Sequence, residues 1–342
     1  MTTSEQAIAR SINSKKLELI LLPTEKCNFR CTYCYENFEH GRMRPWVVRS
    51  LHKLIDIRTR DLSSLKLNWF GGEPLLESKL MVDFASYALQ TCLRNDCELA
   101  PGEVTTNGYL LSQEVFEKLI ATNHRLFQVS LDGDEKGHET SRRHIAGHPT
   151  FQRIMKNLEN LKLMKHEFRV LLRLHLLPTN RDSMLRLAEQ IRGTLLTDAR
   201  FSVLIKAVGD WGGPLSGTFK ALNADEARSR AAELRSALGQ NEASPQETID
   251  PSKGESAYVC YAASANSLLI RADGRVGKCT TALDDSLNTV GHLNPDGTIR
   301  FNSQNLKFWF TGLQTRQPAH LACPYHAVPR TDRRIVPILR LS

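Results

Sequence analysis

The chain has 342 residues, of which 41% are hydrophobic and 24% are charged, and its formal net charge is +8. These values are ordinary for a globular protein, and the length allows one large domain, or one large and one small domain. No apolar run approaches the roughly 20 residues that cross a bilayer, so no membrane contact is expected. The basic residues are scattered and lack interleaved aromatic residues, which argues against nucleic-acid binding and favours a solvated basic surface.

The N-terminal extension, residues 1–16, lacks the apolar stretch of a signal peptide, so we expect a cytoplasmic protein. In that reducing compartment, cysteines at short spacing bind metal or do redox chemistry more often than they form disulfides. The eight cysteines of the chain are therefore the first candidates for a functional site.

Short apolar runs alternate with amphipathic segments over residues 17–208. Strands are predicted at 17–22, 65–70, 98–106, 126–131, 168–176 and 200–207. Helices are predicted after Ser112, Thr150 and Asn180, because apolar residues recur there at helical spacing. Six such units predict an α/β fold, a partial (β/α)6 barrel, since a closed barrel of eight takes about 250 residues.

The pattern changes after this predicted barrel. A glycine-rich loop around Trp211 is followed by a helix that opens at Asn223, with Glu226 as its capping-box partner. This bridging helix and a polar linker make up residues 209–256. The Asp-Gly pairs at 273–274 and 296–297 then predict two hairpins, so residues 257–342 are expected to form a small β-hairpin-rich C-terminal domain.

Three cysteines directly after the first predicted strand form the pattern C-x3-C-x2-C: Cys27, Cys31 and Cys34. Three thiolates from one loop can each bind one iron of a [4Fe–4S] cluster and leave the fourth iron without a protein ligand. An open iron can bind a cosubstrate, as an open zinc position does in catalytic sites. The alternatives are unrelated buried thiols or a zinc site, for which His40 is the nearest fourth ligand in the sequence.

This segment, TEKCNFRCTYCYE, resembles the radical S-adenosylmethionine (SAM) superfamily, and the resemblance covers the whole predicted barrel. It implies that the three cysteines hold the cluster and that the backbone near Tyr33 contacts the adenine of SAM. Gly71, Gly72, Glu73 and Pro74, after the second predicted strand, resemble the motif that holds the amino group of SAM. Glycines there let the backbone approach closely, and the glutamate supplies a nearby negative charge.

Further resemblance lies at the ends of the next strands. It implies that Asn107 and Ser130 contact the ribose and the carboxylate of SAM, and that Arg143 pairs with that carboxylate through two hydrogen bonds. An exposed loop charge is the alternative for this arginine. Arg173 and His175 point the same way along the fifth strand, so one of them is expected either to line the site or to be a satisfied core residue.

The resemblance also implies the chemistry. One electron, from a flavodoxin- or ferredoxin-type donor, cleaves the sulfonium C–S bond of SAM, and the resulting 5′-deoxyadenosyl radical takes a hydrogen atom from the substrate. Because the cofactor does the difficult step, the protein must position it and exclude water. No general base is needed, so no catalytic side chain is assigned.

A second set of cysteines lies in the C-terminal domain. Cys260 and Cys279 flank the first predicted hairpin in the arrangement C-x13-G-x4-C, and Cys323 begins the sequence Cys-Pro-Tyr-His. This resembles the auxiliary-cluster extensions called SPASM and Twitch, which implies a second [4Fe–4S] cluster. His326 stands where the shorter form has its last cysteine, so either this histidine ligates iron or the auxiliary cluster has an open iron.

Enzymes with this combination mostly modify ribosomally made precursor peptides by crosslinking, epimerising or oxidising side chains, so such a peptide is the expected substrate. Because few residues precede the first strand, recognition of a leader peptide is expected to use another surface or a separate partner. Two alternatives remain: a radical dehydrogenase or epimerase of a sugar or other small molecule, and a non-catalytic zinc or electron-transfer module.

Overall fold

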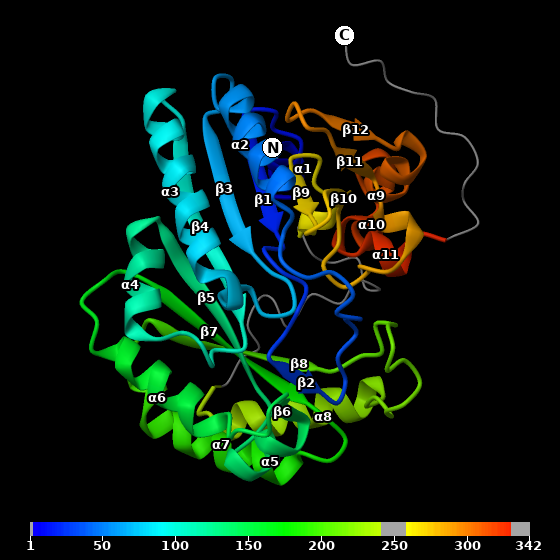
Figure 1. Ribbon diagram of the computed structural model, residues 1–342. Coiled ribbons are helices and arrows are strands. Elements are labelled where there is room, and N and C mark those ends of the chain that lie inside the picture. The colour runs from blue at the N-terminus through cyan, green and yellow to red at the C-terminus, as the bar shows by residue number, and fades with distance from the viewer. Residues whose placement is uncertain (1–2, 241–257, 330–342) are drawn as a thin grey trace.

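The computed structural model describes residues 3–240 and 258–329, and its centre is a ten-stranded sheet (Figure 1). Six neighbouring strands of this sheet are parallel and correspond to the six strands predicted from the sequence. They are β1 Lys16–Leu21, β3 Ser64–Trp69, β4 Glu98–Thr106, β5 His124–Leu131, β7 Arg169–Leu176 and β8 Phe201–Ala207. Within the described residues β8 ends the sheet instead of pairing with β1, so the predicted partial barrel is confirmed.

Helices cover the outer face of the parallel strands (Figure 1). The helices of the first part of the chain are α1 Thr3–Ser11, α2 Pro45–Arg58, α3 Ser78–Arg94, α4 Gln113–Ala121, α5 Glu135–Ser141, α6 Phe151–Lys162, α7 Arg181–Gly193 and α8 Ala224–Ala237, with the 3-10 turns η1 Pro74–Glu77 and η2 Leu195–Thr197. The three helices predicted after Ser112, Thr150 and Asn180 are α4, α6 and α7. The predicted capping box at Asn223 and Glu226 opens α8.

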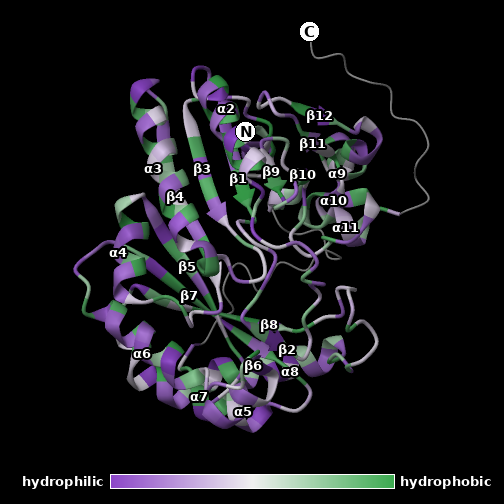
Figure 2. Cartoon of the chain, in the orientation of Figure 1, coloured by the Kyte–Doolittle hydropathy of each residue, from purple (hydrophilic) through white to green (hydrophobic). Residues whose placement is uncertain are grey.

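The core lies between the sheet and these helices, whose outward faces are hydrophilic (Figure 2). The predicted apolar face of α6 is buried, including Phe151, Ile154 and Leu158. Trp69 is also buried, and its indole N–H donates to Nε2 of His124 over 2.7 Å. Burial lowers the pKa of His124 to about 4, so this histidine is neutral in the folded protein near neutral pH.

Both predicted C-terminal hairpins are present. Their strands are β9 Ser267–Ile270, β10 Arg275–Gly277, β11 Gly291–Leu293 and β12 Ile299–Phe301. The remaining elements are η3 Tyr261–Ala263, η4 Ser286–Asn288, α9 Ser303–Thr315, α10 Pro318–Ala322 and α11 Pro324–Ala327.

The hairpin strands continue the sheet of the barrel, because β9 pairs in parallel with β1. The predicted boundaries of the extension, barrel, bridge and C-terminal domain stay predictions, and most of the predicted linker lies outside the described residues. In the described part of the chain, no helix has the length and apolarity to cross a membrane.

A small two-stranded ribbon was not predicted. Strand β2, Phe29–Cys31, lies within the cysteine pattern and pairs antiparallel with β6, Arg142–His144. The pairing places Cys31 opposite Arg142 and Arg30 opposite Arg143. It ties the cysteine loop to the segment that follows β5.

Candidate active site

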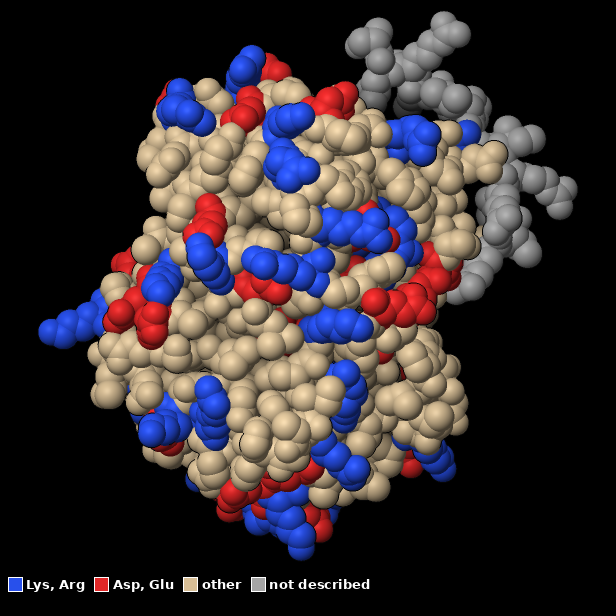
Figure 3. Space-filling view, in the orientation of Figure 1, with Lys and Arg blue, Asp and Glu red and all other residues tan. Residues whose placement is uncertain are grey.

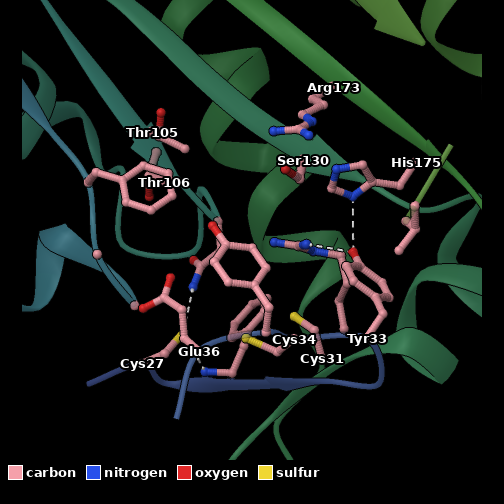
Figure 4. A pocket seen from close by; sticks show the side chains of 18 of the residues that line it. Cys27, Cys31, Tyr33, Cys34, Glu36, Thr105, Thr106, Ser130, Arg173 and His175 are labelled. Carbon is pink, nitrogen blue, oxygen red and sulfur yellow. Dashed lines mark hydrogen bonds between the residues drawn. The ribbon is translucent and has the colours of Figure 1, made fainter. Parts of the chain in front are cut away.

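A cavity opens at the carboxyl ends of the parallel strands, where the sites of α/β barrels form (Figure 4). The residues around it come from the cysteine loop, the loop after β3, and the ends of β4, β5, β7 and β8. Of the predicted site residues, the cavity is lined by Cys27, Cys31, Tyr33, Cys34, Gly71, Gly72, Asn107 and Ser130. The sequence motifs that are far apart along the chain therefore meet at one cavity.

The three cysteines lie on one side of this cavity, with Arg173 and His175 across from them (Figure 4). All three thiols are free. The backbone folds back between them, since the N–H of Cys34 donates to the carbonyl of Cys31 over 3.1 Å. One short loop thus presents three thiols to the same space.

Burial raises the pKa of each thiol, to about 12 for Cys34. A thiol must lose its proton to bind metal, so metal binding at this loop releases protons. Nowhere in the described residues are three His, Cys, Asp or Glu side chains grouped as ligands of a single metal ion. His40, the fourth ligand that the zinc alternative needed, contacts Asp273 and Arg275 instead.

The Gly-Gly-Glu-Pro loop packs directly on the cysteine loop. Gly71 has a φ of +126°, and a Cβ atom there would lie 2.2 Å from the carbonyl oxygen of Thr24. A Cβ atom on Gly72 would lie 2.5 Å from the carbonyl oxygen of Lys26. Only glycine fits at these two positions, because the segment that leads into Cys27 occupies the space of a side chain.

Glu73 is fully buried behind this loop and does not line the cavity. One carboxylate oxygen accepts from the N–H of Leu75 and the hydroxyl of Thr106, and the other accepts from the N–H of Asn107. The glutamate therefore fixes the loop, which ends in Pro74, to the end of β4. Burial raises the pKa of this carboxyl, and these three donors offset that effect only in part.

Asn107 turns its side chain toward the cysteine loop. Its Nδ2 donates to Oδ1 of Asn28 over 2.8 Å, and its Oδ1 accepts from the N–H of Tyr109. The amide nitrogen of Asn28 is buried without a hydrogen-bond partner among the described residues. This orphaned donor beside Cys27 marks a place where a bound group would complete the hydrogen bonding.

A buried polar network surrounds the side chain of Tyr33. Its hydroxyl donates to Asp132 over 2.7 Å, accepts from Nη1 of Arg142 over 3.0 Å and lies 3.0 Å from Nδ1 of His175. Burial alone would raise the pKa of Asp132, but the hydrogen bond to His175 and the charge of Arg142 lower it. Asp132 is thus a carboxylate that holds Tyr33 and His175 in fixed positions.

The structure places Arg142, and not the predicted Arg143, at the cavity. Arg142 is 6% exposed and lines the cavity. Arg143 is exposed on the opposite face of β6, where its Nε donates to the carbonyl of Thr140. Successive residues of a strand point to opposite faces, so only one of two adjacent arginines can enter the site.

Sequence analysis left the position of one charged cavity residue, Arg173, open and did not identify another, Glu36. Arg173 lies opposite Ser130 in the β5–β7 register, and its Nε is buried without a hydrogen-bond partner in the described residues. Glu36 lies in the cavity wall beside Cys27 (Figure 4), and burial raises the pKa of its carboxyl to about 8. Its position two residues after the last cysteine was the only signal available.

The second set of cysteines is brought together from three segments. Cys260 precedes η3, Cys279 follows β10, and Cys323 lies between α10 and α11. The N–H of Cys260 donates to the carbonyl of Leu321, which joins two of these segments. Burial, reinforced by the other two thiols, raises the pKa of Cys260 to about 12.

His326 is exposed, and its ring lies 5.1 Å from the ring of Trp211. Its backbone N–H, like that of Tyr325, approaches the thiol of Cys323 and lowers a pKa that burial raises overall. Its predicted role as an iron ligand stays a prediction.

A family model described as the Radical SAM superfamily matches residues 21–191, which is half of the chain, and the chain therefore belongs to this superfamily. It is a radical SAM enzyme, and the cofactors of this superfamily are SAM and a [4Fe–4S] cluster.

The chain is 32% identical over 148 residues to the serine-type anaerobic sulfatase-maturating enzyme of Bacteroides thetaiotaomicron, which covers 40% of this chain and 34% of that protein. The match thus spans about a third of this relative. The fold is similar to that of native anSMEcpe with bound AdoMet and Cp18Cys peptide, with a TM-score of 0.62, 20% identity, and coverage of 86% of this chain and 83% of that one. It is also similar to Streptococcus suis SuiB bound to precursor peptide SuiA, with a TM-score of 0.54, 17% identity, and coverage of 82% and 63%.

Proposed function

We propose that the chain cleaves SAM reductively in the cytoplasm and that the 5′-deoxyadenosyl radical takes a hydrogen atom from a peptide or protein side chain. The observation that carries this proposal is the convergence of three free thiols, Cys27, Cys31 and Cys34, on one cavity at the carboxyl ends of the parallel strands. The cavity also contains cationic and hydrogen-bonding groups at its opposite side. This is the arrangement that a zwitterionic cosubstrate and a thiolate-bound cluster require.

The residues present fit a [4Fe–4S] cluster, since the donor set is three thiols and the site retains an orphaned amide donor on Asn28. When bound, the cluster supplies the electron that cleaves SAM. The protein holds the cysteine loop in place through Gly71 and Gly72, and it fixes that pair through Glu73. These contacts position the ligands before any cofactor arrives.

The binding of SAM falls to the other residues of the cavity. We assign the carboxylate of SAM to Arg142, because this guanidinium enters the cavity while its neighbour Arg143 does not. Ser130 and Asn107 remain the candidates for hydrogen bonds to the methionine and ribose parts, and the backbone near Tyr33 for the adenine. Arg142 donates to the hydroxyl of Tyr33, which in turn donates to Asp132, and this network holds the guanidinium in place.

We assign a second [4Fe–4S] cluster to Cys260, Cys279 and Cys323. The fit rests on three free, partly or fully buried thiols, of which Cys279 and Cys323 are close enough to Cys260 to raise its pKa. The fourth position is either His326 or open. An electron from the substrate radical would have an acceptor here.

An extended peptide suits the cavity better than a small sugar does. Trp211 lines both the main cavity and a second groove on its other side, which Asp210, Tyr325 and His326 also line. A chain passing the indole could occupy both spaces, whereas a sugar would need a smaller, closed pocket. SuiB, which was solved with a precursor peptide, and the sulfatase-maturating enzymes support this substrate class by similarity of fold and sequence. A separate leader-binding partner remains part of this proposal.

The test uses anaerobically reconstituted full-length protein. We expect about eight irons per chain, as two [4Fe–4S] clusters require, and release of 5′-deoxyadenosine from SAM on reduction. The variant C27A/C31A/C34A should release none. If this variant still releases 5′-deoxyadenosine, or if the wild type binds zinc without iron, the proposal is wrong.

The substrate class is tested separately by adding a deuterated peptide or a deuterated sugar to the reconstituted protein. Transfer of deuterium from the peptide into 5′-deoxyadenosine supports a peptide substrate. Transfer from a deuterated sugar, and none from the peptide, would favour the small-molecule alternative.

A further inference from the structure

One of the two arginines of the cavity has no partner. Arg173 lies on β7 and enters the cavity from the side across from the cysteines (Figure 4). Its Nε is buried without a hydrogen bond, and within residues 3–240 and 258–329 its side chain makes no hydrogen bond and no ion pair. A guanidinium carries five N–H donors, and buried donors are nearly always satisfied. A guanidinium that the fold leaves unsatisfied in a cavity wall therefore points to an anionic ligand.

The cavity does not supply an acidic partner for this guanidinium. Of the described residues that line the cavity, Glu36 is the one acidic side chain, and it lies beside Cys27, on the side of the cysteines. The neighbours of Arg173 on the sheet are Ser130, opposite in register, and His175. Burial and, in addition, the charge of Arg173 lower the pKa of His175, to about 4, so this imidazole is neutral near pH 7. The positive charge of Arg173 thus remains available to a bound molecule.

The two arginines of the cavity stand in different surroundings. Arg142 lies opposite Cys31 in the β2–β6 ribbon and donates to the hydroxyl of Tyr33, so it belongs to the side of the cysteine loop. Arg173 lies opposite Ser130 in the register of β5 and β7. SAM has a single carboxylate, for which Arg142 is the proposed partner. The second guanidinium is then left for the other molecule that the cavity must hold, the substrate.

Arg173 also lies on the route that a peptide would follow. Trp211 lines the same cavity and borders the second groove, together with Tyr325 and His326. A peptide that passes this indole and enters the cavity brings one of its side chains, or its C-terminal end, to the guanidinium. Away from bulk water, a charged hydrogen bond to such a group is stronger than a neutral one, and an unmatched group is costly.

We propose that Arg173 is a specificity-determining residue that binds a carboxylate of the peptide substrate, either the side chain of an Asp or Glu close to the reacting residue or a C-terminal carboxylate. This inference rests on the proposed function, because it requires a peptide to enter the cavity together with SAM. Arg173 forms no covalent bond and transfers no proton, and it fixes the substrate through two parallel hydrogen bonds. A substrate without the carboxylate is rejected, because the guanidinium then stays unpaired.

The test measures binding of synthetic peptide pools to the reconstituted full-length protein with SAM and without reductant. The pools are short peptides of random sequence with capped ends. One has Asp or Glu at the central position, a second has Asn or Gln there, and a third equals the second but keeps a free C-terminal carboxylate. The wild type should retain one carboxylate pool about tenfold better than the capped amide pool, because a two-point charged hydrogen bond is worth that much or more. The pool that is retained identifies the source of the carboxylate.

Variants of Arg173 make the test specific. R173Q should lose the preference, R173K should keep part of it, and R173E should favour a further pool, with Lys at the central position, over either carboxylate pool. Lys and Arg side chains are spread over the face in Figure 3, so acidic peptides are also attracted without specificity. Roughly 0.15 M salt screens this long-range attraction. R143Q removes the same charge from an exposed position outside the cavity, and as the matched control it should keep the wild-type preference.

Two further measurements separate substrate binding from other roles. R173Q should bind SAM with wild-type affinity, and about tenfold weaker binding would show that the carboxylate of SAM is the ligand. The melting temperature of R173Q should be unchanged or higher, because the side chain has no partner to lose. The proposal is wrong if the wild type prefers no carboxylate pool, if R173Q keeps the preference, if R143Q loses it, or if R173Q weakens SAM binding or melts at a clearly lower temperature.

Failure of the proposed function would look different. It would show in the wild type, before any peptide pool is added, as missing iron or as missing 5′-deoxyadenosine after reduction. The comparison of the pools does not depend on cleavage of SAM, because it is made without reductant. A wild type that holds iron and cleaves SAM but retains all pools equally leaves the radical chemistry in place and overturns the role of Arg173 alone.

Discussion

The two sets of cysteines reach similar surroundings by opposite routes. Cys27, Cys31 and Cys34 come from one loop, and their arrangement is set by local backbone geometry and by two glycines in the loop after β3. Cys260, Cys279 and Cys323 come from three segments, which hairpin pairing and helix packing bring together. The first set is therefore specified by sequence spacing, and the second exists only in the complete fold.

A buried ion pair connects the two regions. Arg271, directly after β9, contacts Glu25, which lies two residues before Cys27. It also donates to the carbonyl of Leu283 over 2.6 Å. Both side chains of the pair are at most 5% exposed. The C-terminal region is thus built into the support of the N-terminal cysteine loop, and a disturbance of one should reach the other.

The largest effect should come from removing either set of thiols. C260A/C279A/C323A should lose about half of the iron, as expected for one of two clusters, yet still release 5′-deoxyadenosine from SAM. C27A/C31A/C34A should release none. Iron analysis and chromatography of the nucleoside measure both outcomes, and equal loss of cleavage in the two variants would show that the regions do not have separate roles.

The connection between the regions is tested by Arg271→Met. Removing one partner of a buried pair leaves an uncompensated charge on Glu25, so the free energy of unfolding should fall by about 3–5 kcal/mol. E25Q/R271M should recover part of this loss, because neither member of the pair then carries a charge. Denaturant unfolding measures both variants, and a double variant no more stable than the single one contradicts the pairing.

Acid should act through the barrel, since it contains buried neutral histidines while His292 and His326 of the C-terminal region are exposed. The folded pKa of His124 is about 4, below its ordinary 6.5, so the folded state binds fewer protons between these values and stability is lost as pH falls from 6.5 to 4. This contribution is on the order of 3 kcal/mol. His124→Gln should flatten the dependence of unfolding free energy on pH in that window, and an unchanged slope would contradict the assignment.

The smallest effect is expected at Glu73. In Glu73→Gln the amide oxygen can keep the contacts to Leu75 and Thr106, but the amide nitrogen would face the N–H of Asn107. Two opposed donors should lower the free energy of unfolding by about 1–3 kcal/mol. Thermal unfolding of the apoprotein measures it. A fully stable variant would mean that Glu73 has a purpose other than holding the loop.

Local patterns predicted most of the barrel and part of the site. Apolar periodicity located six strands, capping residues such as Ser112 and Asn223 located helix starts, and Asp-Gly pairs located both hairpins. The β1–β9 and β2–β6 pairings were not predictable, because long-range pairing leaves no mark in a short apolar run.

A similar physical reason explains why sequence analysis chose the wrong arginine for the cavity and missed another residue of its wall. Arg142 and Arg143 are chemically identical, and only the pairing of β6 with β2 decides which one faces the cavity. Glu36 needed the fold to show that its carboxyl is buried in the cavity wall. Spacing identifies ligands on one loop, whereas the orientation of a single side chain depends on its partner strand.

The parallel pairing of β9 with β1 has a consequence for dissecting the molecule. Truncation before residue 258 would strip β1 of one neighbour along Glu18–Leu21 and leave its backbone N–H and C=O groups open on that side. An unpaired edge strand can pair with a strand of another chain. A shortened barrel should therefore self-associate instead of remaining a monomer. A chimera that takes its C-terminal region from another protein must therefore keep a strand that pairs with β1 as β9 does.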